Sequence, residues 1–170
     1  RANRVEAPLS FAQQRLWFLH QLDPDSTAYN VPVYYRLSGQ LNVTALERSL
    51  NEIVRRHEIL RTIFTERHAA PVQIVLPSLY VALPIIDLTA YHQIEAEVEN
   101  FIEAETARPF SLEDGPLLRV TLLKLSEDEH GFFLVIHHIV TDGWSMDIFM
   151  NELLTFYEAF SVDEPSPLAE

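Results

Sequence analysis

Residues 132–145 read FFLVIHHIVTDGWS, and the interpretation of the rest of the chain starts from this stretch. The apolar run from Phe132 to Ile136 predicts a strand, and His137 and His138 stand at its end. An Asp-Gly turn at Asp142 then starts a helix. Because neighbouring side chains of a strand face opposite sides, we expect only one of the two histidines to face inward.

The segments on either side of this strand complete a hairpin and a long helix. Two apolar runs, 117–125 and 131–137, are separated by the polar residues 126–130, which predicts an antiparallel hairpin with a five-residue loop. The last helix carries an aromatic and apolar stripe at spacings of four, three and four, made by Phe149, Leu153, Phe156 and Phe160.

Towards the N-terminus, the pattern alternates between helices and short strands. Three helices are predicted: one over 11–21 with Ser10 and Gln13 as a capping box, one capped by Asn42 with an apolar stripe from Val43 to Val54, and one capped by Thr89. Strands are predicted over 31–38, 60–65, 72–76 and 80–87. Without a regular βαβ alternation, these elements predict an α+β fold, in which helices cover one face of a mixed, largely antiparallel sheet. Trp17 and Phe18 are expected in the core.

Composition narrows the class of protein. The chain has 170 residues, about one domain, and 12 basic against 25 acidic residues give a net charge of −13, the wrong sign for binding nucleic acid. The absence of cysteine excludes disulfides, Cys-type zinc sites and thiolate nucleophiles. The longest uncharged stretch, 69–86, contains three prolines, so we expect no membrane segment. The N-terminus lacks an initiator Met and a secretory signal, and 163–170 is typical of a linker. We therefore expect a cytoplasmic segment of a longer protein.

The histidine pair has more than one interpretation from the residues alone. Opposite-facing histidines argue against a metal site, whereas a histidine at a strand end is placed for proton transfer near neutral pH. Asp142 either orients an imidazole or is buried with a cationic partner. Gly143 either allows a close approach of substrate and offers its N–H to an oxyanion, or is a turn glycine with positive φ. A purely structural role of the pair is the simplest alternative.

Four motifs then point to one family. Residues 137–145, HHIVTDGWS, resemble the His-His-x-x-x-Asp-Gly signature of condensation domains of nonribosomal peptide synthetases. Residues 9–19, 56–64 and 109–119 resemble further motifs of that family, in the expected order. The resemblance implies a chloramphenicol-acetyltransferase-like fold of two lobes with a tunnel between them, of which residues 1–170 are the N-terminal lobe.

The resemblance also assigns roles to individual residues. It implies that His138 lies at the reacting centre, either as general base on the attacking amine or as stabiliser of the charged transition state. His137 supports it, Gly143 lies next to substrate, and Trp144 and Ser145 line the tunnel. Asp142 is expected to form an ion pair with Arg61 that fixes the loop. No metal and no directly bound cofactor are implied.

The implied substrates are protein-tethered. Aminoacyl and peptidyl thioesters arrive on the 4'-phosphopantetheine arms of carrier-protein domains, and the missing C-terminal lobe is a further partner. A heterocyclisation domain is disfavoured because both histidines are kept, an epimerisation domain because Trp144 and Ser145 follow Gly143 directly, and a free-standing acyltransferase because the second lobe is missing. A rival of another class is a non-catalytic half-domain that docks carrier proteins or has a structural role.

Overall fold

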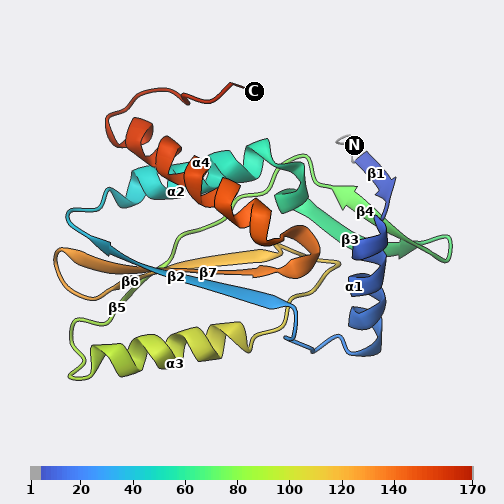
Figure 1. Ribbon diagram of the computed structural model, residues 1–170, viewed down its shortest axis with the longest axis horizontal. Coiled ribbons are helices and arrows are strands. Elements are labelled where there is room, and N and C mark those ends of the chain that lie inside the picture. Colours follow the sequence, from blue (N-terminus) through green and yellow to red (C-terminus); the bar gives the residue numbers. More distant parts are fainter. Residues whose placement is uncertain (1–4, 170) are drawn as a thin grey trace.

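The computed structural model describes residues 5–169 (Figure 1). The elements, in chain order, are β1 (Val5–Pro8), α1 (Phe11–Leu22), β2 (Asn30–Ser38), α2 (Val43–Arg56), η1 (Glu58–Arg61), β3 (Thr62–Arg67), β4 (Ala70–Val75), β5 (Ile85–Asp87), α3 (Ile94–Thr106), β6 (Leu118–Lys124), β7 (Glu129–His137), η2 (His138–Val140) and α4 (Gly143–Ser161). Here η marks a short 3-10 helix. Residues 1–4, in which the sequence suggested a truncated start, lie outside the described part.

The larger sheet has the strand order β2-β7-β6-β5. β7 pairs antiparallel with both β2 and β6, while the short β5 pairs parallel with β6. Leu134, in the middle of β7, is registered with Val33 on one side and with Val120 on the other. The predicted mixed, largely antiparallel sheet and the predicted hairpin are thus confirmed, and β7 is an interior strand. The predicted five-residue loop over 126–130 is wrong in its bounds, because β7 already begins at Glu129 and His130 pairs with Lys124.

Helices cover both faces of this sheet, not one face as the sequence suggested. Figure 1 shows α2 and α4 above the sheet and α3 below it. The main core lies between the sheet and the pair α2 and α4, and a smaller cluster between the sheet and α3 contains Val98 and Leu123. Because β7 is buried along both faces, its sequence is continuously apolar instead of alternating. The one-face expectation failed because a continuously apolar strand does not show which helices cover it.

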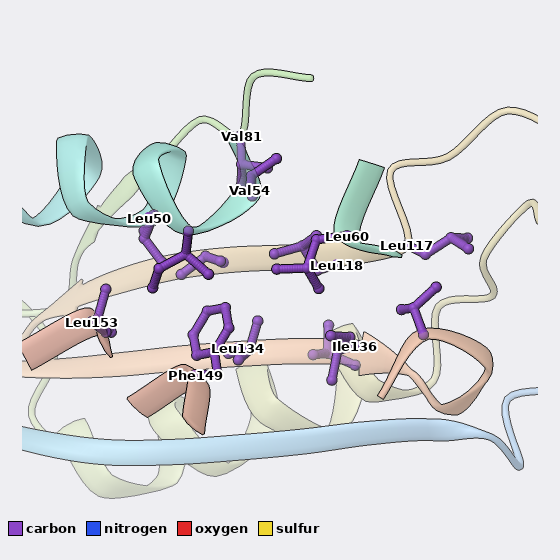
Figure 2. Close-up of a cluster of buried hydrophobic side chains, with 14 of the residues drawn as sticks. Leu50, Val54, Leu60, Val81, Leu117, Leu118, Leu134, Ile136, Phe149 and Leu153 are labelled. Carbon is purple, nitrogen blue, oxygen red and sulfur yellow. The ribbon is translucent and has the colours of Figure 1, made fainter. Parts of the chain in front are cut away.

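The main core is built from large apolar side chains of several elements. Figure 2 shows Leu50 and Val54 of α2, Leu134 of β7, and Phe149 and Leu153 of α4 converging between the helices and the sheet. Leu50, Val54 and Leu134 are at most 1% exposed. The predicted stripes of α2 and α4 therefore form their buried faces, with Asn42 capping α2 through a bond from the Ala45 N–H.

A second sheet, ordered β1-β4-β3, lies beside α1 (Figure 1). The capping box of Ser10 and Gln13 at the start of α1 is confirmed. Phe18 was expected in the core, but it is 58% exposed, whereas Trp17 packs partly against the core. Among the described residues, no helix combines the length and the apolarity needed to cross a membrane.

Two further boundaries differ from the sequence prediction. Of the strand expected over 80–87, only Ile85–Asp87 pairs in the sheet. The predicted cap Thr89 donates from its N–H and its hydroxyl to Asp87, so it forms a local turn, and α3 begins five residues later. Asp and Thr side chains favour such turns because they offer the backbone a short-range partner.

Candidate active site at the end of β7

The end of β7 is held from both sides by backbone hydrogen bonds. The His137 N–H donates to the Leu117 carbonyl at 2.9 Å, and the His138 N–H donates to the Tyr29 carbonyl at 2.8 Å. Tyr29 precedes β2 and Leu117 precedes β6, so the ends of the two neighbouring strands fix the pair. The chain then leaves the sheet through η2 and enters α4.

His137 is the inward-facing histidine, with 3% of its surface exposed. Its Nδ1 accepts a hydrogen bond from the Ile139 N–H at 3.1 Å, which leaves the proton of the neutral ring on Nε2. The ring of Phe110 lies perpendicular to the His137 ring, with 6.1 Å between the ring centroids. Burial lowers the pKa of His137 from 6.5 to about 4, and the charges of His20 and His138 act in the same direction. His137 is therefore neutral near physiological pH.

His138 is the outward-facing histidine and is exposed. This confirms the expectation that only one of the two histidines faces inward. Within residues 5–169 no hydrogen bond ties the ring of His138 to another side chain or to the backbone, so both of its nitrogen atoms are accessible to a ligand. A ring that is fixed at its backbone and open at its nitrogen atoms is suited to accept or donate a proton or a hydrogen bond.

Asp142 caps α4 and lies at the surface. Its Oδ1 accepts from the Ser145 N–H at 2.8 Å and from the Ser145 hydroxyl at 2.6 Å. These hydrogen bonds, more than the nearby His138, hold the pKa of Asp142 below its ordinary value. The carboxylate thus fixes the start of the helix on which Gly143, Trp144 and Ser145 lie.

The predicted ion pair between Asp142 and Arg61 does not form in this structure. Arg61 donates to the Leu76 carbonyl and pairs with Glu58 at 3.1 Å, so it links η1 to the end of β4. The expectation failed because Asp142 is exposed and finds its partner three residues ahead, as an N-cap residue commonly does. Arg61 therefore does not contact Asp142, and it contributes to the surroundings of the site only by fixing η1.

Gly143 is the first residue of α4 and leaves open space above the helix. A Cβ added there would meet no atom within 4 Å. Among the described glycines, positive φ is found at Gly39 and Gly115, so the interpretation of Gly143 as a positive-φ turn residue is excluded. Trp144 next to it is 77% exposed. The N-terminus of this 19-residue helix is thus accessible and favours negative charge.

Sequence reasoning missed three contributors to the surroundings of the site. His20 of α1 lies close enough to influence His137, and burial lowers its own pKa against three nearby carboxylates. His57, at the end of α2, contacts Glu152 of α4 with 2.6 Å between Nε2 and Oε2. Met146 lines a cavity beside the loop. No local spacing connects His20 and His57 to the histidine pair, because tertiary packing brings them together, whereas Met146 directly follows Ser145 in the sequence.

The described residues contain no cluster of three His, Asp or Glu side chains that could hold a metal ion. The arrangement offers an exposed imidazole, a neutral buried imidazole next to it in the sequence, and an open helix N-terminus. Such a set can exchange a proton and stabilise negative charge on an oxygen.

Solved structures that resemble this chain include condensation domains. The structure aligns with the starter condensation domain of rhizomide synthetase RzmA at a TM-score of 0.91 and 25% identity, covering 98% of this chain and 42% of that chain. It aligns with the first condensation domain of the calcium-dependent antibiotic synthetase at a TM-score of 0.89 and 30% identity, covering 98% and 40%. The α+β class and the expected chloramphenicol-acetyltransferase-like lobe are thereby supported.

Sequence comparison gives the family. The Condensation domain family model matches residues 3–170. A linear gramicidin synthase of Brevibacillus parabrevis is 50% identical over 165 residues, and chondramide synthase cmdD of Chondromyces crocatus is 48% identical over 165 residues. The chain belongs to the condensation domain family. Both matches cover 96% of this chain, but only 2% and 4% of those proteins, and the chain spans about two fifths of the solved condensation domains.

Proposed function

We propose that the chain is the N-terminal lobe of a condensation domain, residues 1–170 with 163–170 beginning the linker, and that the intact domain forms peptide bonds. The α-amino group of an acceptor aminoacyl thioester attacks a donor acyl or peptidyl thioester, and the thiol leaves. The observation that carries the proposal is the exposed ring of His138, fixed at the end of β7 beside the open N-terminus of α4.

In this proposal, His138 acts on the attacking amine or on the oxygen of the tetrahedral transition state. Thioester aminolysis starts from an activated acyl group and a nucleophilic amine, so fixed geometry contributes much of the rate, up to about 7–11 kcal/mol. His137 positions His138 from behind as a neutral ring. Asp142 shapes the helix start, Gly143 leaves room for substrate, and Trp144 and Ser145 line the entrance. Arg61 supports the loop indirectly through η1.

The proposed partners follow from the missing part of the domain. The substrates are thioesters on the 4'-phosphopantetheine of carrier proteins, in the cytoplasm, and no group other than substrate is needed. The C-terminal lobe would cover α1, whose residues Phe11, Phe18 and Leu22 share one helix face and are 92%, 58% and 68% exposed. We expect the isolated lobe to be inactive, because one wall of the tunnel is absent.

The exposed face of α1 also favours a second candidate. A non-catalytic half-domain that docks a carrier protein or a second lobe would use the same apolar stripe without requiring His138. The two candidates predict different effects of removing His138, because only the catalytic candidate predicts a loss of product.

The test combines residues 1–170 with a separately produced second lobe and two loaded carrier proteins, and follows carrier-bound dipeptide by mass spectrometry. We expect product only when both lobes are present, and a loss of about 100-fold or more with His138→Ala. His92→Ala, at an exposed histidine before α3, is the matched control and should retain activity. Full activity of a folded His138→Ala protein would favour the non-catalytic candidate.

A further inference from the structure

The chain that leaves α3 lies against the sheet beside the histidine pair. Residues 106–110, which begin at the last residue of α3, are called the bridging segment below. Figure 1 shows the end of α3 on the side of the sheet where β2 begins and β7 ends. Strand register places Asn30 of β2 opposite His137, and Arg119 of β6 opposite Val135. The end of β7 therefore lies between two side chains that carry hydrogen-bond donors, one from each neighbouring strand.

Asn30 ties β2 to the bridging segment. Its side-chain amide donates to the Thr106 carbonyl at 2.7 Å and to the Arg108 carbonyl at 3.0 Å. The last carbonyls of a helix have no partner within the helix, so these bonds complete the end of α3. The preceding residue, Tyr29, offers the carbonyl to which the His138 N–H donates at 2.8 Å. The side chain that holds the bridging segment and the carbonyl that holds His138 thus belong to adjacent residues.

Arg119 holds the bridging segment from the other side of β7. Its guanidinium donates to the Arg108 carbonyl at 2.8 Å and to the Glu105 carbonyl at 2.9 Å. The guanidinium carbon lies 3.9 Å from the centroid of the Phe110 ring, which is the ring perpendicular to His137. Arg119 therefore fixes both the backbone of the bridging segment and the aromatic ring beside His137.

The Arg108 carbonyl receives a donor from each side. A carbonyl oxygen has two lone pairs, so Asn30 and Arg119 can occupy both at once. Asn30 is buried, and the side chain of Arg119 is 14% exposed, so water is a poor substitute for either donor. The shared carbonyl links β2 to β6 across the end of β7, and a change in one donor is expected to affect the bond made by the other.

The amide of Asn30 also carries a cost in stability. Its Oδ1 is buried and has no hydrogen-bond partner within the part of the chain that the structure describes. A buried acceptor without a partner is unfavourable, and such exceptions are expected mainly near functional sites. The two bonds to the bridging segment are therefore the contribution that this side chain makes.

We propose that Asn30 and Arg119 are positioning residues for the histidine at the proposed reacting centre. By fixing the bridging segment from both sides of β7, they fix the Tyr29 carbonyl and, through it, the backbone of His138. The inference rests on the proposed function, because its consequence is a rate at His138. A shift of about 1 Å in a reacting group can reduce a rate about 100-fold, so a small displacement is sufficient.

The test measures kcat and KM of the intact condensation domain with Asn30→Leu, which keeps the branched outline of the side chain and removes both donors. Values of kcat are normalised to the folded fraction. We expect kcat to fall by about 10- to 100-fold and KM for both thioesters to change by less than about 2-fold, because a reacting group is displaced while substrate binding is kept.

Val98→Ala is the matched control. Val98 anchors α3 in the apolar cluster against the sheet, outside the bridging segment. Its truncation destabilises the attachment of the same helix without removing a bond to the bridging segment. The normalised kcat of Val98→Ala should therefore stay within about 2-fold of the unmodified domain.

Hydrogen exchange of the intact domain, followed by mass spectrometry, provides the local measurement. In Asn30→Leu, the peptide that contains the His138 N–H should lose protection, while the peptide over 120–124 in β6 should keep it. A role confined to attaching α3 would instead accelerate exchange in that helix and leave the His138 peptide unchanged, and this result would overturn the inference.

Arg119→Lys is an independent variant that decides the question if Asn30→Leu does not fold. Lysine keeps the positive charge but lacks the planar fork that reaches two carbonyls at once, so the normalised kcat should also fall. In the double variant the fall should be smaller than the product of the two single falls, because both single variants loosen the same carbonyl.

Two outcomes separate the inference from the function on which it rests. If His138→Ala abolishes turnover while Asn30→Leu and Arg119→Lys retain the normalised kcat, or change only KM, the positioning role is wrong and the function stands. Turnover that survives in His138→Ala would overturn both.

Discussion

The buried neutral His137 predicts a specific loss of stability in mild acid. The pKa of this histidine is about 4 in the folded chain against 6.5 for an unperturbed ring. Between these values the unfolded chain binds a proton that the folded chain excludes, so stability rises with pH across this window. The stability that depends on the neutral His137 is fully present above about pH 6.5 and is lost as the pH falls towards about 4. The difference between the two pKa values corresponds to a loss in the free energy of unfolding of about 3 kcal/mol in total, and of about 2 kcal/mol between about pH 7 and about pH 5.

The assay is urea unfolding followed by tryptophan fluorescence at several pH values. His137→Asn is the informative variant, because an amide oxygen can accept the Ile139 N–H in place of Nδ1 and does not titrate. Its stability at neutral pH is expected to be lower, but its decline towards pH 5 should be about 2 kcal/mol smaller than that of the unmodified chain. Other titrating groups contribute equally to both proteins and cancel in this difference.

The exposed neighbour provides the control. His138→Asn keeps the burial of His137, which is the main cause of its low pKa, so its stability should decline with acid nearly as steeply as that of the unmodified chain. If His137→Asn and the unmodified chain show equal slopes between about pH 7 and pH 5, burial does not keep His137 neutral and the reasoning is wrong.

Three further predictions concern the site and the core. Asp142→Ala should lower the stability and loosen the start of α4, whereas Asp142→Asn should retain the cap, as circular dichroism and thermal unfolding would show. Gly143→Ala should raise the free energy of unfolding by about 0.4–1 kcal/mol, since φ is not positive and the space is open, yet reduce turnover of the intact domain by crowding substrate. Leu134→Ala, at a fully buried position of β7, should cost about 2–5 kcal/mol in urea unfolding. An unchanged midpoint there, a helix start unaffected by Asp142→Ala, or full turnover in Gly143→Ala would contradict these expectations.

Local patterns predicted those parts of the fold that depend on local physics. The stripe of α2, its cap at Asn42 and the hairpin of β6 and β7 follow from side-chain periodicity and hydrogen-bonding capacity within a few residues. The patterns did not predict that α3 covers the opposite face, or that Thr89 turns back to Asp87 instead of capping a helix. Those outcomes depend on which segments meet in space.

The same division applies to the site. Strand alternation predicted that only one of His137 and His138 faces inward, because a two-residue period needs no tertiary information. The predicted partner of Asp142, Arg61, was wrong, because the choice between Arg61 and Ser145 depends on how far the loop lies from η1. The contact between His57 and Glu152 and the cavity beside Met146 depend on how α4 packs against the end of α2, against η1 and against β7, which no spacing in the sequence reveals.

The placement of the histidine pair explains why one ring is accessible and the other is not. The N–H groups of His137 and His138 donate to the carbonyls of Leu117 and Tyr29, the residues that precede β6 and β2. The backbone is therefore fixed from both sides, independently of the contacts that the two rings make. The ring of His137 then fills the interior and keeps its neutral form, because a charge there would be buried without a partner. Near neutral pH the buried ring adds no positive charge behind His138. The charged groups next to the exposed ring are therefore the carboxylate of Asp142 and the helix N-terminus at Gly143, both of which lie at the surface.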